Sequence, residues 1–137
     1  MKSVIISTAA ALALALATGF SAPAKSNEAP DFVRDTYPEH GVDVAWEGIK
    51  SVFMDPDAAL DGKTKELIAL AVSAQIPCDY CVYSHTRGAE AHGATDAEIR
   101  EALATGALIR KWSTILNGSR YDMERFRDEI DAMFGDG

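Results

Sequence analysis

Residues 66–85 read ELIALAVSAQIPCDYCVYSH. This stretch holds both cysteines of the chain, Cys78 and Cys81, in a C-x-x-C spacing, and His85 follows four residues after the second. A pair of this kind can be a structural disulfide, two ligands of a metal ion or a working redox couple. The helices predicted around the pair, and the composition of the chain, bear on which of these it is.

The segment before the cysteines predicts a buried helix. The string LIALAVSAQ is apolar on nearly every side, as expected of a central helix. Asp61 or Thr64 can start this helix, and Pro77 ends it or lies in the turn that follows. The next helix is expected to begin near Cys78 and to run to His92, where the adjacent glycine stops it.

Three further helices are expected, and no run of alternating β-branched residues indicates a sheet. One covers Val42–Met54 and is stopped by an Asp-Pro pair. Another begins with a capping box at Thr95–Glu98 and ends at Asn117, next to a glycine. The last runs from about Tyr121 and shows apolar residues at helical spacing. The sequence therefore predicts an all-α domain whose apolar stripes are core or subunit contacts.

The first 24 residues are predicted to be a signal peptide that is cleaved after Ala24. Lys2 precedes an alanine- and leucine-rich run from Val4 to Phe20, and small residues follow it. The run falls short of the ~20 strongly apolar residues that a membrane span requires. The protein is therefore expected to be exported, to the periplasm or to the medium. We divide the rest into a lead-in over residues 25–41 and a helical domain over residues 42–137.

The charge of the chain is strongly acidic. The formal net charge is −8, and removal of the predicted signal peptide leaves 12 basic against 21 acidic residues, or −9. Such a surface repels nucleic acid and anionic membranes. We expect neither nucleic acid nor a stable membrane association as a partner.

The cysteine spacing argues against a purely structural disulfide. Exported proteins commonly use disulfides as staples that join distant segments. A bond between residues three apart closes a very small loop, and the stabilisation gained by restricting the unfolded chain grows with loop length. The pair is therefore expected to serve a purpose other than stability.

A helix that begins near Cys78 places both cysteines and His85 on one face. Free backbone N–H groups and the positive end of the helix dipole favour a thiolate there. His85 lies one turn from Cys81 and can take its proton, which favours Cys81 as a nucleophile. Glu66 is a candidate to orient the histidine, although its position also suits a solvated residue in the first turns of a helix.

A resemblance to a known family is carried by the string LDGKTKELIALAVS…CDYCVYSH…GAEAHGATDAEIREAL. It resembles the carboxymuconolactone decarboxylase-like superfamily and is most similar to its alkylhydroperoxidase D (AhpD)-like branch. The motif is a glutamate twelve residues before the first cysteine, a C-x-x-C pair and a histidine four residues after the second. Glu66, Cys78, Cys81 and His85 match it, and the resemblance covers about residues 60–116.

The resemblance implies a fold and an activity. The fold would be an AhpD-like bundle of about five to six helices that forms a homo-oligomer. The activity would be a peroxiredoxin-type reduction of hydroperoxides that needs no cofactor and no metal. Cys81 would attack the peroxide and become a sulfenic acid, and Cys78 would donate a proton and then form the disulfide. Glu66 and His85 would relay the proton of Cys81, and an external dithiol or thiol protein would reduce the disulfide.

Three alternatives use the same residues or the same family. An exported protein thiol–disulfide oxidoreductase would need the same four side chains. A zinc- or copper-binding module could use both cysteines and His85, with Glu66 or His92 as a further ligand. A lactone decarboxylase would follow the name of the superfamily, although the family's decarboxylases do not depend on a C-x-x-C pair.

Overall fold

The computed structural model of the chain describes residues 28–135, and the predicted signal peptide lies outside these described residues. Within them the chain forms six α-helices and one 3₁₀ turn, η1, and no strand. In chain order they are α1 (Asp31–Arg34), η1 (Glu39–Gly41), α2 (Val42–Phe53), α3 (Gly62–Gln75), α4 (Asp79–Ala91), α5 (Asp96–Ser119) and α6 (Met123–Phe134). The all-α prediction is confirmed. None of the helices in residues 28–135 has the length and apolar character needed to cross a bilayer.

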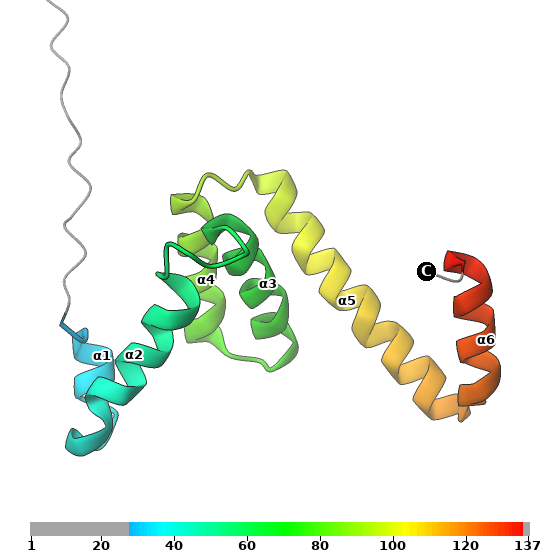
Figure 1. Ribbon diagram of the computed structural model, residues 1–137, viewed down its shortest axis with the longest axis horizontal. Helices are drawn as coiled ribbons and strands as arrows, with labels where there is room; N and C mark the ends of the chain where they lie inside the picture. Colours follow the sequence, from blue (N-terminus) through cyan, green and yellow to red (C-terminus); the bar gives the residue numbers. More distant parts are fainter. Residues whose placement is uncertain (1–27, 136–137) are drawn as a thin grey trace, which may run out of the picture.

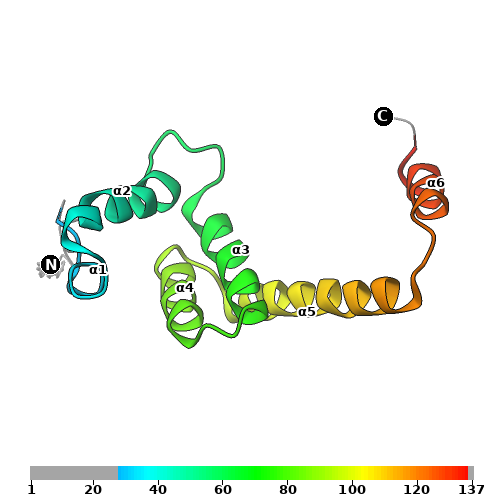
Figure 2. The same ribbon diagram turned by 90° about the horizontal axis from the view of Figure 1, so that it is seen from below.

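The helices form an open arrangement around one central hairpin (Figures 1 and 2). Helices α3 and α4 lie side by side at its centre, and α1 and α2 lie to one side of them. Helix α5 packs against α3 along its first half and then runs outward. Helix α6 lies at the far end of α5, away from the hairpin in both views.

The core of this protomer is small. Its buried residues, among those that the structure describes, are Ala29, Val33, Leu70, Ser73 and Ala89. Leu70 on α3 and Ala89 on α4 have no exposed surface, so the core lies between these two helices. The prediction that α3 is buried on nearly every side is wrong for the protomer, because Ile68 and Val72 are half exposed. Helices α4 and α5 cover part of α3, and its remaining apolar face points outward.

Capping residues set the ends of the central helices. The carboxylate of Asp61 accepts a hydrogen bond from the backbone N–H of Thr64 at 2.8 Å, so Asp61 is the N-cap of α3. Cys78 is the N-cap of α4, one residue before the first helical position. Gly93 follows the last turn of α4 with a φ of +80°, a conformation that glycine adopts without strain. The predicted boundaries of both helices are confirmed to within a residue or two.

The described part of the lead-in, residues 28–41, is more ordered than the sequence indicated. It contains α1 and η1, and Val33 on α1 is buried. The guanidinium of Arg34 donates to the carbonyl of Ala29 and pairs with Asp31, which ties α1 to the chain that precedes it. A helix of four residues is too short to show a hydrophobic period, which is why the sequence did not reveal it.

The predicted capping box at the start of α5 is present and is joined to α3. The Thr95 hydroxyl accepts from the backbone N–H of Glu98 at 3.2 Å, and the Glu98 carboxylate accepts from the N–H of Thr95 at 2.7 Å. The ammonium of Lys63 lies 2.7 Å from the same carboxylate. The hydrogen bonds from Lys63 and then from Thr95 lower the pKa of Glu98 from 4.5 to about 2.

This lowered pKa predicts a pH-dependent contribution to stability. A carboxylate whose pKa is lower in the folded state stabilises the fold above its unfolded pKa, and this contribution is lost as the pH falls through the folded value. The difference in urea midpoint between the wild type and Glu98→Gln should therefore be largest above pH 5 and shrink between about pH 4.5 and 2. Glu101→Gln, on the same helix, should show no comparable trend, and an equal trend in both variants would contradict the assignment.

Candidate active site

The cysteine pair lies at the N-terminus of α4. Cys78 and Cys81 are joined by a disulfide, with their Cα atoms 5.2 Å apart. The backbone N–H of Cys81 donates to the Cys78 sulfur at 3.2 Å, so the sulfur occupies the N-cap position. Unpaired N–H groups and the helix dipole at this end favour a negative charge on sulfur once the bond is reduced. Both cysteines are half-buried.

A carboxylate–imidazole pair joins α3 to α4 beside the cysteines. Oε2 of Glu66 lies 2.7 Å from Nδ1 of His85, and the two side chains are 14% and 22% exposed. Glu66 therefore points inward, which settles a question that its sequence position left open. In the neutral imidazole, a proton on Nδ1 can be donated to the carboxylate, and Nε2 is then the nitrogen that can accept one. This is the protonation state that a general base requires.

Two neighbours that the sequence did not single out hold this pair in place. The ring of Phe53, at the end of α2, stacks on the imidazole of His85 with a centroid distance of 5.2 Å and an interplanar angle of 26°. Gly88, one turn after His85, leaves the space that the carboxylate of Glu66 occupies, since a Cβ there would lie 2.5 Å from its carboxyl carbon. A glycine inside a helix destabilises the helix by about 1 kcal/mol relative to alanine. Its presence at position 88, inside a predicted helix, was therefore a sequence signal that a neighbour needs the space.

A cavity of about 470 Å³ opens beside the pair. Its lining residues are Pro30, Phe32, Trp46, Ile49, Phe53, Met54, Glu66, Tyr80, Cys81, Ser84 and His85. Cys81 is among them and Cys78 is not. Cys81 thus borders a mostly apolar cavity together with the histidine and the glutamate, and Cys78 does not line it.

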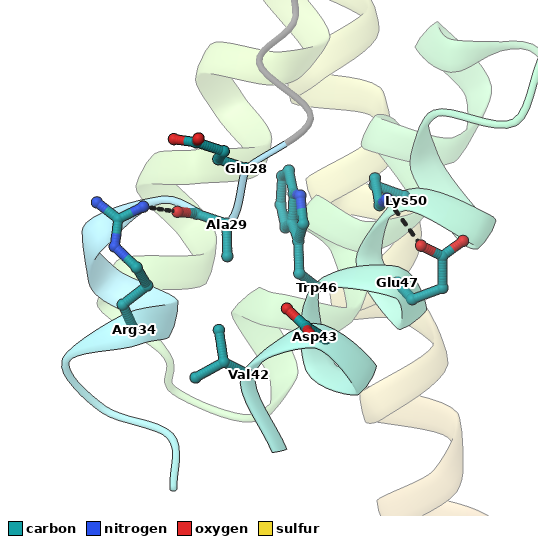
Figure 3. Close-up of a pocket in the computed structure, with 8 residues that line it drawn as sticks. All are labelled: Glu28, Ala29, Arg34, Val42, Asp43, Trp46, Glu47 and Lys50. Carbon is teal, nitrogen blue, oxygen red and sulfur yellow. Dashed lines mark hydrogen bonds and ion pairs between the residues drawn. The ribbon is translucent and has the colours of Figure 1, made fainter. Parts of the chain in front are cut away.

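The apolar wall of this cavity comes from the N-terminal segment and α2. Trp46 on α2 also lines a second cavity of about 630 Å³, which is shown in Figure 3 with its bounding side chains from the N-terminal segment and α2. In that view the ion pair between Lys50 and Glu47, 2.7 Å long, lies on one side of the indole. The lead-in and α2 therefore position residues around the cysteines, a role that the sequence did not indicate.

The structure places the residues of the alternative metal site in other contacts. Both sulfurs are bonded to each other, and Glu66 and His85 bind each other. His92 lies against the start of α3, where a Cβ on Gly62 would be 2.4 Å from its imidazole. Among residues 28–135 no group of three or more histidine, cysteine, aspartate or glutamate side chains is placed to hold a metal ion.

The fold and the site together define an all-α protein with a cysteine pair at a helix N-terminus and a glutamate–histidine pair beside it. The family model for the carboxymuconolactone decarboxylase family matches residues 43–121. The chain therefore belongs to the carboxymuconolactone decarboxylase family, and its fold is AhpD-like.

The AhpD-like assignment comes from a solved structure. The chain is similar to the crystal structure of the alkylhydroperoxidase AhpD core from Rhodospirillum rubrum, with 35% sequence identity and a TM-score of 0.59. The similarity covers 64% of this chain and 65% of that one, somewhat less than two thirds of its length.

Two further relatives extend the comparison. "Uncharacterized protein 4 in cox locus" of Paracoccus denitrificans is 44% identical over 76 residues, which are 56% of this chain and 67% of that protein. An uncharacterised protein of Cupriavidus necator is 46% identical over 48 residues, 35% of this chain and 42% of that one.

The geometry of the site predicts which histidine controls the reactivity of Cys81. In the reduced protein, His85→Asn should slow alkylation of Cys81 by iodoacetamide at neutral pH about tenfold, because the base that takes the thiol proton is lost. The rate is measured by mass spectrometry of quenched samples. His92→Asn, at the C-cap of the same helix and against the start of α3, is the matched control and should change the rate less than twofold. Equal effects would contradict a role for His85.

Proposed function

We propose that this protein is a thiol-dependent hydroperoxide reductase in which Cys81 attacks the peroxide. One observation carries the proposal: Cys81, and not its partner Cys78, lines an apolar cavity together with the hydrogen-bonded Glu66–His85 pair. A nucleophile, an adjacent base and a group that orients the base are the three parts that activated-thiol chemistry needs. The similarity to an alkylhydroperoxidase core supports the same chemistry.

The catalytic cycle starts from the reduced pair. Nε2 of His85 takes the proton of Cys81, and the imidazolium that forms is stabilised by Glu66. The thiolate attacks the terminal peroxide oxygen, the O–O bond breaks, and the departing alkoxide takes the proton of Cys78 to leave as an alcohol. Cys81 is now a sulfenic acid, and two electrons have passed from sulfur to the peroxide.

The second half of the cycle forms the disulfide. The Cys78 thiolate attacks the Cys81 sulfur, and the departing hydroxide takes the proton from His85 to form water. The disulfide that results is the state in which the structure shows the pair. An external dithiol or thiol protein then reduces it by thiol–disulfide exchange, which returns two electrons and two protons.

The apolar wall of the cavity supports an organic hydroperoxide as the substrate. Phe32, Trp46, Ile49 and Phe53 can bury the hydrocarbon part of such a molecule, while its peroxide group meets Cys81. The predicted signal peptide supports a site of action outside the cytoplasm, with a reductant in the same compartment. The acidic surface supports the absence of nucleic acid and membrane partners, and we propose a homo-oligomer.

A second candidate is a thiol–disulfide oxidoreductase that acts on exported proteins. It is favoured by the apolar side chains exposed around the disulfide, among which Tyr80 is 91% exposed and Tyr83 and Ile76 are largely exposed. A peptide substrate could contact these side chains while its disulfide exchanges with the pair.

Intact-mass measurement of the anaerobically reduced protein tests the proposal. One equivalent of cumene hydroperoxide should lower the mass by about 2 Da within the mixing time, as the disulfide forms. Cys81→Ser should abolish this loss, and the matched Cys78→Ser variant should instead gain about 16 Da as a sulfenic acid.

The other outcomes each identify a rival. Thiols that do not react with peroxide but exchange rapidly with a protein disulfide would contradict the proposal. They would favour the thiol–disulfide oxidoreductase. Unreactive thiols on a native protein that carries stoichiometric zinc or copper would favour a metal-binding module. Unreactive thiols and turnover of a muconolactone would favour a decarboxylase.

A further inference from the structure

Ser84 is a polar residue of the candidate site to which the proposed cycle gives no role. It lies on α4, three residues after Cys81 and directly before His85, and it lines the same cavity as both of them. We call this cavity the Cys81 cavity. Residues three apart on a helix are neighbours on its surface, with Cβ atoms about 5–6 Å apart. A hydroxyl at position 84 can therefore reach a molecule that is in contact with the Cys81 sulfur.

The hydroxyl of Ser84 has no hydrogen-bond partner in the part of the chain that the structure describes. Serine and threonine hydroxyls inside a helix can donate to the backbone carbonyl one turn earlier. Several hydroxyls in the described helices do so, namely those of Ser51, Ser73, Thr105, Thr114 and Ser119. Ser84 does not, and it is an exposed residue. Its hydroxyl is therefore available to a molecule that enters the Cys81 cavity.

The other polar side chains near Cys81 are engaged or point elsewhere. Glu66 and His85 bind each other, with 2.7 Å between Oε2 and Nδ1, and the remaining nitrogen of His85 takes the thiol proton in the proposed cycle. Tyr80 also lines the cavity, but it is 91% exposed and directly precedes Cys81. Consecutive residues of a helix do not face each other. Ser84 is thus a hydroxyl that lies one helical turn from the sulfur and has no other task.

The peroxide step needs a hydrogen-bond donor at one particular atom. As the O–O bond breaks, negative charge develops on the oxygen that leaves as an alkoxide. The wall formed by Trp46, Ile49 and Phe53 is mostly apolar, and such surroundings solvate a developing charge poorly. A donor that is already in place where the charge develops stabilises the transition state more than the same donor does in water. The leaving oxygen is one bond beyond the attacked one, within reach of a hydroxyl beside the sulfur.

We propose that the Ser84 hydroxyl donates a hydrogen bond to the departing oxygen of the hydroperoxide while the Cys81 sulfur attacks the other oxygen. This inference rests on the peroxide chemistry proposed above and adds a catalytic residue to it. The S–O bond forms as the O–O bond breaks, and the alkoxide takes its proton from Cys78 as before. Ser84 keeps its own proton, so its hydroxyl is unchanged when the alcohol leaves.

Three variants of the full chain test this role. Ser84→Ala removes the hydroxyl, and Ser84→Thr keeps it. Thr86→Val is the matched control, because it removes a hydroxyl from the same helix at a residue that does not line the Cys81 cavity. Each reduced protein is mixed with cumene hydroperoxide at several concentrations and quenched in acid. The rate at which the mass falls by about 2 Da then gives the second-order rate constant of oxidation.

The hydroxyl should matter for peroxide and not for the thiol itself. Ser84→Ala should lower the rate constant about tenfold, whereas Ser84→Thr should stay within about threefold of the wild type and Thr86→Val within about twofold. Alkylation of Cys81 by iodoacetamide involves no leaving oxygen, so all three variants should alkylate within about twofold of the wild-type rate. Peracetic acid releases acetate, a much weaker base than an alkoxide, so Ser84→Ala should slow its reaction by less than about threefold.

The possible failures are distinguishable. A wild type that cumene hydroperoxide does not oxidise would contradict the proposed function, and the role of Ser84 with it. A wild type that is oxidised rapidly, with Ser84→Ala equally fast, would overturn the role of Ser84 alone. Equal slowing of alkylation, or of the reaction with peracetic acid, would also overturn it, because Ser84 would then act on the thiol or on the fold and not on the leaving oxygen.

Discussion

The hydrogen bond between Glu66 and His85 is the interaction on which the site depends. It joins the two helices of the central hairpin, it is mostly shielded from water, and it favours the neutral tautomer in which Nδ1 donates to the carboxylate. A carboxylate at this depth needs a partner, since burying an unpaired charge is costly. The surrounding residues hold this pair in place. Phe53 stacks on the imidazole, and Gly88, which has no side chain, leaves room for the carboxylate.

The helices could be predicted from local signals, because their ends are set by residues next to each other in the chain. Asp61 and Gly93 act through the backbone a few residues away, and the capping box at Thr95 is a four-residue motif. The four candidate site residues were predicted because both cysteines and His85 stand at helical spacing and Glu66 stands at a family spacing. Such patterns are visible in a single sequence.

The remaining features depend on contacts between distant segments. Phe53 lies 32 residues before His85, and nothing in its neighbourhood marks it as a stacking partner. The inward direction of Glu66 depends on the packing of α3 on α4, which sequence spacing does not give. The expected burial of α3 on every side is wrong for the protomer because α4 and α5 cover part of it. The exposed apolar side chains of α3 stay predicted subunit contacts of the proposed homo-oligomer.

The central claim is that Cys81 is the sulfur that meets the peroxide, and trapping of the sulfenic acid tests it most directly. Reduced Cys78→Ser and Cys81→Ser proteins are each treated with one equivalent of cumene hydroperoxide in the presence of dimedone, and the adduct is located by peptide mapping. The account predicts a rapid adduct on Cys81 in the first variant and little adduct on Cys78 in the second. An adduct that forms equally fast on Cys78, or on neither cysteine, would contradict it.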